Sequence, residues 1–162
     1  MARFVSLTLS ELPSGIWQTR LPVRFGSCDP AGIVYTPEYL NLFNGVIEDW
    51  YGDALGIPYH ELVGTRKIGL GYAHVSADFA KPSRMGDVLD VAVIVREIGR
   101  ASLTLTVQAF KDNAERVRAT FVTVTTSLID HKPIALPDDL RLALKNYQAY
   151  CNESRLVSTS TA

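Results

Sequence analysis

A long amphipathic helix is predicted by residues 36–58, which read TPEYLNLFNGVIEDWYGDALGIP. Thr36 can cap its first turn, Pro37 suits the first helical position, and Glu38 favours the positive end of the helix dipole. Gly56 and Pro58 end the helix. Its apolar residues recur at helical spacing and form one stripe: Tyr39, Phe43, Val46, Ile47, Trp50, Ala54 and Ile57. The fold must bury this stripe against a second layer.

Segments that alternate between apolar and polar residues lie on both sides of this helix. One strand is predicted before it, over residues 17–25. Four strands are predicted after it, with turn residues between them: 71–80, 87–98, 102–110 and 116–129. This order excludes a doubly wound parallel sheet, in which strands and helices alternate. It predicts an α+β fold in which one antiparallel sheet wraps around the long helix.

The C-terminal part adds a second helix and a tail. Leucines and Tyr147 predict a helix over residues 138–150, which follows Pro137. The polar residues 154–162 are expected to form a disordered tail. One domain is therefore expected over residues 1–153.

The composition is that of a soluble globular protein with a substantial core. The chain has 162 residues, of which 47% are hydrophobic and 20% are charged. Its net charge of −1 argues against nucleic-acid binding, which requires a basic surface. No segment approaches the roughly 20 apolar residues of a membrane span. Cys28 and Cys151 form no metal-spaced pair, which favours reduced thiols and a cytoplasmic location.

The loop between the first strand and the helix carries a candidate catalytic carboxylate, Asp29. One interpretation is structural, because Asp-Pro-Ala-Gly suits the four positions of a type I turn. The other is catalytic, because Asp29 lies a few residues before a helix start, where free backbone N–H groups can bind developing negative charge. Spacing alone leaves both interpretations open.

Three segments carry a resemblance to a known family. Residues 24–35 read RFGSCDPAGIVY and are followed by the helix; residues 69–71 read GLG, and residues 79–89 read FAKPSRMGDVL. Together these segments resemble the 4-hydroxybenzoyl-CoA thioesterase family of hotdog proteins. The resemblance covers roughly residues 17 to 130 and implies a hotdog fold. It also implies that two chains pair edge to edge as a homodimer, and that dimers pair into a homotetramer.

The resemblance also implies roles for individual residues. Asp29 matches the catalytic carboxylate, which acts on the thioester carbonyl as nucleophile or as general base for water. The backbone N–H of Thr36 matches the donor that polarises the carbonyl oxygen. No metal and no cofactor are implied, since CoA enters only as part of the acyl-CoA substrate. Glu48, on the helix, is a fallback catalyst, because a related branch of the family places its acid there.

Five further residues are assigned to substrate binding. Lys81, Arg84 and Arg100 match positions that meet CoA phosphates, often across subunits; the alternative for each is a solvated surface charge. Tyr35 belongs to the motif, and Asn44 lies on the flank of the helical stripe, where it could line an acyl pocket.

The leading functional hypothesis is an acyl-CoA thioesterase that acts on an aromatic (benzoyl-type) or short-chain acyl group. The alternative is a hotdog module that binds acyl-CoA without hydrolysing it, although such a module has no need of Asp29. A dehydratase of the same fold is disfavoured, because its His-plus-acid arrangement has no counterpart before His60.

Overall fold

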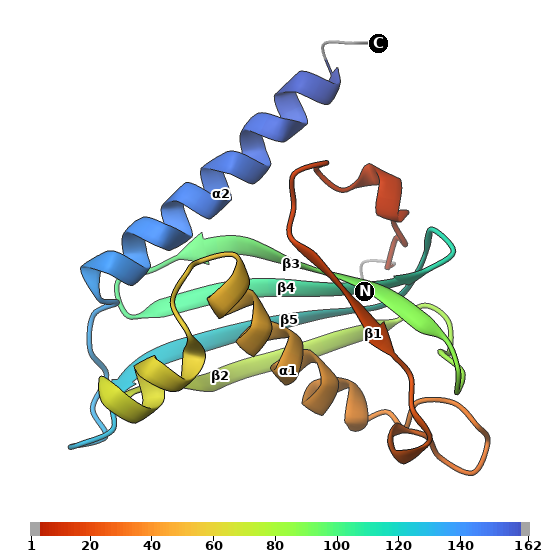
Figure 1. Cartoon of the computed structure of the whole chain (residues 1–162), viewed down its shortest axis with the longest axis horizontal. Helices are drawn as coiled ribbons and strands as arrows, with labels where there is room; N and C mark the ends of the chain where they lie inside the picture. Colours follow the sequence, from red (N-terminus) through yellow and green to blue (C-terminus); the bar gives the residue numbers. More distant parts are fainter. Residues whose placement is uncertain (1–3, 160–162) are drawn as a thin grey trace.

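The computed structural model describes residues 4–159 and confirms the predicted α+β fold. Five strands form one antiparallel sheet in the order β1-β3-β4-β5-β2. The strands are β1 (Gln18–Pro22), β2 (Ile68–Phe79), β3 (Val88–Ile98), β4 (Ser102–Lys111) and β5 (Ala114–Ser127). The long helix lies across one face of the sheet (Figure 1). The sheet therefore has two free edges, a short one at β1 and a long one at β2.

The long helix, α1 (Glu38–Asp53), buries the predicted stripe from Tyr39 to Trp50 against the sheet. It ends earlier than predicted, so Ala54 and Ile57 lie beyond it and are only partly buried. Its buried residues are Tyr39, Phe43, Val46, Ile47, Trp50 and Tyr51. The prediction that Thr36 caps the helix was wrong, because Pro37 occupies the N-cap position and makes no side-chain cap bond. The carbonyls of Tyr35 and Thr36 accept the N–H groups of Glu38 and Tyr39 instead, at 2.8 and 3.3 Å. Thr36 thus lies in a turn that leads into α1.

The second helix, α2 (Asp138–Thr159), is longer than predicted. It is helical over residues 154–159, where a disordered tail was expected, and residues 160–162 lie outside the described part of the chain. Neither Gly nor Pro occurs between Pro137 and Thr159, so the sequence contains no helix breaker there.

Side chains of α2 satisfy backbone carbonyls along β3. The short strand β1 pairs with β3 only over residues 88–92. Beyond that point the hydroxyl of Tyr147 donates to the carbonyl of Val93 at 2.7 Å. The amide of Gln148 donates to the carbonyls of Val95 and Arg96 at 3.3 and 3.2 Å. The helix therefore covers the part of the β3 edge that β1 leaves open.

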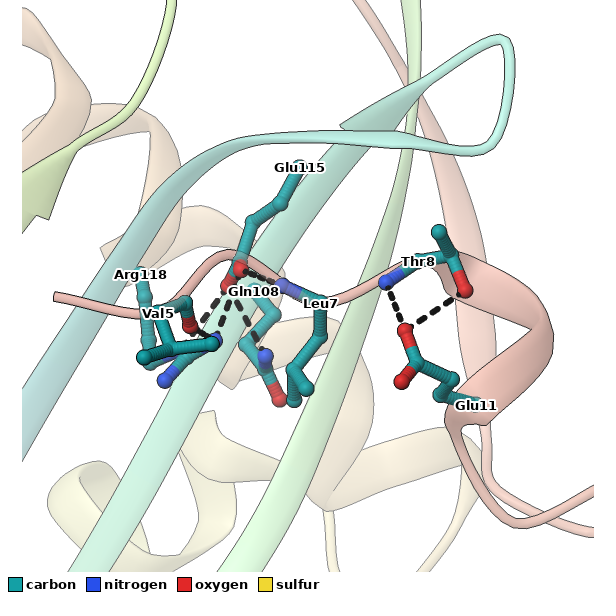
Figure 2. Close-up of polar contacts among 7 residues, drawn as sticks. All are labelled: Val5, Leu7, Thr8, Glu11, Gln108, Glu115 and Arg118. Carbon is teal, nitrogen blue, oxygen red and sulfur yellow. Dashed lines mark hydrogen bonds and ion pairs between the residues drawn. The ribbon is translucent and has the colours of Figure 1, made fainter.

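The sheet face opposite α1 carries a buried ionic network (Figure 2). A bulge at Arg116 places Glu115 on the same face as Gln108, since Ala109 pairs with Val117 but Phe110 pairs with Glu115. Glu115 is 1% exposed. Its carboxylate accepts hydrogen bonds from three groups, each at 2.9 Å or less: the Gln108 amide, the Arg118 guanidinium and the backbone N–H of Leu7. This carboxylate fastens the N-terminal segment to the sheet.

Candidate functional site

The loop that carries Asp29 is a tight hairpin. The N–H of Tyr35 donates to the carbonyl of Ser27, and the N–H of Asp29 donates to the carbonyl of Ile33, both at 2.9 Å. The turn closes at Gly32, whose φ of 73° is a conformation that favours glycine. The sequence Asp-Pro-Ala-Gly therefore folds as the turn that its residue types predict.

Asp29 is half-buried, and one of its carboxylate oxygens supports this turn. That oxygen, Oδ1, accepts the backbone N–H of Ala31 at 2.8 Å. Within the described part of the chain, no group donates to the second oxygen. The structural and the catalytic interpretation of Asp29 are therefore compatible, since one oxygen holds the loop and the other is available for chemistry.

Thr36 presents a backbone N–H at the start of α1. This N–H has no hydrogen-bond partner among the groups that the structure describes. It belongs to the turn before the helix, where the helix dipole is positive and anionic groups are stabilised. The arrangement suits a carbonyl oxygen that gains negative charge during a reaction.

Thr36 also lines two mainly apolar cavities, and Phe79 lines both of them as well. One has a volume of about 370 Å³ and is lined by Ile33, Val34, Thr36, Tyr39, Phe79, Ala80, Lys81 and Pro82. The other has a volume of about 310 Å³ and is lined by Thr36, Pro37, Leu40, Val75, Ser76, Ala77 and Phe79. Asp29 lines neither cavity. The helix start, and not the carboxylate, therefore forms the wall of these cavities.

Three of the predicted binding residues gather near the Asp29 hairpin. Lys81 lines the larger cavity. Arg84 is exposed and forms a β-bridge with Ile33, and its backbone N–H donates to the Asp87 carboxylate at 2.8 Å. Tyr35 is 54% exposed at the base of the hairpin.

Arg100 lies at the opposite end of β3 from Arg84. The eleven residues of β3 span roughly 35 Å, so the two side chains cannot meet one ligand near the hairpin of a single chain. The backbone of Arg100 is used locally, since its carbonyl accepts the N–H of Leu136 and the guanidinium of Arg141, both at 2.9 Å. Arg100 can reach a CoA at such a site only from a second chain.

Asn44 lies two turns along α1 from Thr36, about 12 Å along the helix axis. Its amide oxygen accepts the hydroxyl of Tyr72 at 2.7 Å, and its amide nitrogen donates to Glu48 at 3.0 Å. The hydroxyl is the donor because an amide oxygen can only accept, and burial raises the pKa of Tyr72 to about 12. Asn44 and Glu48 thus form a polar group separate from the Asp29 hairpin.

Sequence reasoning missed two buried polar residues beside the site, Tyr39 and Ser83. The hydroxyl of Tyr39 donates to Oγ of Ser83 at 2.9 Å, and burial raises the pKa of Tyr39. The sequence assigned Tyr39 to the apolar stripe and Ser83 only to a motif. The sequence offered one indication of this pair, namely that a buried tyrosine hydroxyl needs a hydrogen-bond partner. This rule does not show that the partner is Ser83.

Among the side chains that the structure describes, His, Cys, Asp and Glu do not gather in groups of three that could hold a metal ion. No helix in the described part of the chain is both long and apolar enough to cross a bilayer.

Comparison with known proteins identifies a family for this chain and solved structures that share its fold. Residues 23–144 match the thioesterase-like superfamily. A 1,4-dihydroxy-2-naphthoyl-CoA hydrolase of Prochlorococcus marinus (strain NATL2A) is 31% identical over 132 residues, which cover 75% of this chain and 83% of that protein.

Two solved structures share the fold. A 1,4-dihydroxy-2-naphthoyl-CoA thioesterase from Synechocystis has a TM-score of 0.74 and 21% identity, covering 82% of this chain and 97% of the other. The gentisyl-coenzyme A thioesterase BH1999 has a TM-score of 0.73 and 23% identity, and the match covers 79% of this chain and 99% of the other. From the superfamily match and the 31% identical relative, we conclude that this chain belongs to the thioesterase-like superfamily.

Proposed function

We propose that this thioesterase hydrolyses an acyl-CoA whose acyl group is aromatic or short. The observation that carries the proposal is the N–H of Thr36 at the start of α1, which has no partner in the described part of the chain. It lies in the wall of two apolar cavities and a few residues after Asp29. A thioester needs little more than this, because its carbonyl is already electrophilic and its thiolate leaves readily.

In the proposed reaction the thioester oxygen accepts the N–H of Thr36, and negative charge develops on that oxygen. Asp29 attacks the carbonyl carbon directly, or it removes a proton from a water molecule that attacks. The C–S bond breaks, and CoA leaves as a thiolate that takes up a proton. In the first route, water then hydrolyses the mixed anhydride on Asp29. Both routes consume one water and release the free acid and CoA.

The aromatic class is favoured by the lining of the larger cavity and by the relatives. Tyr39 and Phe79 line that cavity, and their ring centroids are 5.6 Å apart. The relatives named above act, by their names, on dihydroxynaphthoyl-CoA and gentisyl-CoA. The motifs around Asp29 and Pro82 favour the 4-hydroxybenzoyl-CoA branch among such enzymes.

We also propose that two chains form a homodimer along β2 and that two dimers form a homotetramer. Strand β2 has twelve residues and lies at the free edge of the sheet. Tyr72 and Phe79 on this strand are 40% and 49% exposed. A long edge strand with exposed apolar side chains is a favourable surface for pairing with a second copy. Such a dimer would allow Arg100 of one chain to approach a CoA bound to the other.

The test is release of free CoA thiol from aromatic and aliphatic acyl-CoAs by the purified protein. Hydrolysis of one class supports the proposal and identifies the acyl group. Binding of the same acyl-CoAs without thiol release would support the alternative, a module that binds acyl-CoA and does not hydrolyse it. Calorimetric titration with a thioether analogue of the substrate measures this binding separately from turnover.

Substitution of Arg84 by alanine should raise KM by about tenfold and leave kcat within about twofold, because a contact to a CoA phosphate contributes equally to the ground state and the transition state. Steady-state kinetics on the best acyl-CoA measures both constants. Arg100→Ala should give a similar rise in KM only if a second chain supplies Arg100. A fall in kcat alone would contradict the assignment of Arg84 to phosphate binding.

A further inference from the structure

We propose that Ser83 and Tyr39 are a positioning pair that sets the N–H of Thr36 relative to the Asp29 hairpin. The inference rests on the proposed function, because it concerns the alignment of the same reaction centre. The two hydroxyl groups need not touch the substrate, because the hydrogen bond between them is buried and the residues are only 0% (Ser83) and 4% (Tyr39) exposed. The ring of Tyr39 lines the larger cavity.

Ser83 holds the chain on both sides of Thr36. Its carbonyl accepts the N–H of Val34 at 2.9 Å, on the hairpin side. Its hydroxyl oxygen accepts the hydroxyl of Tyr39 at 2.9 Å, on the helix side. Thr36 lies between these two anchored residues, and its own N–H is bonded to neither segment. Ser83 therefore fixes the positions of Val34 and Tyr39, and the Thr36 peptide lies between these two residues.

Ser83 is itself held firmly by its neighbours. The guanidinium of Arg116 donates to the carbonyl of Pro82 at 3.1 Å, and the carbonyl of Arg116 accepts the N–H groups of the two residues before Pro82. On the other side of Ser83, the N–H of Met85 donates to the carbonyl of Gly32 at 3.0 Å. The turn that contains Ser83 is thus fastened both to β5 and to the Asp29 hairpin.

This arrangement has a consequence for the rate of the chemical step. An oxyanion donor acts mainly in the transition state, so a small displacement of the Thr36 N–H lowers kcat more than it raises KM. A displacement of about 1 Å at a reaction centre can cost about 100-fold in rate. Loss of the Ser83–Tyr39 hydrogen bond should therefore lower kcat by about 10- to 100-fold.

Three variants separate positioning from simple stabilisation. Ser83→Ala leaves the buried hydroxyl of Tyr39 without its acceptor, and Tyr39→Phe leaves Oγ of Ser83 without its donor. The double variant removes both polar groups, which is much less costly to stability than leaving one of them unpaired. We expect Tm to fall in both single variants and to recover in the double variant, whereas kcat stays about 10- to 100-fold low in all three. Recovery of kcat together with Tm would overturn the proposal.

Tyr147→Phe is the matched control, because it removes another buried tyrosine hydroxyl, on α2, that donates to the carbonyl of Val93. It should lower Tm and leave kcat unchanged. Hydrogen exchange of the amides of residues 29–36 is the second measurement and does not depend on turnover. Exchange in the double variant should be faster than in the wild type, and unchanged exchange would overturn the proposal. If wild type hydrolyses no acyl-CoA, the proposed function fails, and the exchange result still decides the positioning role.

Discussion

Replacement of Asp29 by asparagine should lower kcat for acyl-CoA hydrolysis by at least about 1,000-fold. An amide can neither attack the thioester carbonyl nor take a proton from water, so the chemical step loses the catalytic group that we propose for it. The asparagine oxygen can still accept the N–H of Ala31, which Asp29 accepts at 2.8 Å, and the turn is retained. The measurement is release of free CoA thiol by the two proteins at saturating substrate, with KM and Tm measured alongside.

Glu48→Gln is the companion variant, because Glu48 is the fallback catalyst on α1. It should keep kcat within a few-fold of wild type, since Glu48 lies with Asn44, away from the Asp29 hairpin. Near-normal turnover in Asp29→Asn combined with a collapse in Glu48→Gln would move the catalytic role to the helix. Equal Tm values in both variants and wild type would show that the kinetic changes are local.

The order of strands and helices in this chain could be predicted because each element is indicated by its own short stretch of sequence. Strict alternation predicted a strand over residues 102–110, and the structure places β4 at Ser102–Lys111. The helical stripe predicted the buried face of α1, from Tyr39 to Trp50. The start of that helix was predicted less well, because backbone carbonyls satisfy its first N–H groups and the Thr36 side chain is not used as a cap.

The candidate site could be predicted only in part, because its remaining features depend on contacts between distant segments. The motif identified the Asp29 hairpin and the position of Thr36. The pairing of Tyr39 with Ser83 joins residues 44 positions apart, and no local pattern indicates it. Arg100 was assigned to the site by resemblance, but β3 carries it to the far end of the sheet, where only a second chain can bring it to a ligand. The Tyr39–Ser83 pair and the position of Arg100 both depend on how distant segments pack, which a single sequence does not show.

Replacement of Glu115 by glutamine should lower the free energy of unfolding by about 3 kcal/mol, the usual cost of breaking a buried ion pair. The Glu115 carboxylate uses both oxygens to accept hydrogen bonds from Arg118, and it also accepts the N–H of Leu7. An amide has only one acceptor oxygen, so one of these donors must face an NH₂ group. Urea unfolding at neutral pH measures the difference. A loss of this size is a large fraction of the stability of an ordinary domain.

The effect of Glu115→Gln should also depend on pH. Burial raises the pKa of Glu115, but hydrogen bonds from Arg118, Leu7 and Gln108 outweigh it and hold the pKa below the ordinary value of 4.5. A folded-state pKa below the unfolded value stabilises the fold above about pH 4.5, and that contribution is lost as the pH falls through the folded-state pKa. The stability difference between wild type and variant should therefore be greatest near neutral pH and narrow below about pH 4.5.

Glu11 provides the matched control, because it lies in the same N-terminal segment but is exposed (Figure 2). Its carboxylate accepts the N–H and the hydroxyl of Thr8 at 2.6 and 2.7 Å, and solvent can replace both bonds. Glu11→Gln should therefore change stability much less than Glu115→Gln. Equal losses in the two variants would contradict the view that burial makes the Glu115 network strong. This network lies on the sheet face opposite α1, so folded Glu115→Gln protein should keep wild-type kcat. That result would separate the anchoring of the N-terminal segment from the chemistry proposed for Asp29.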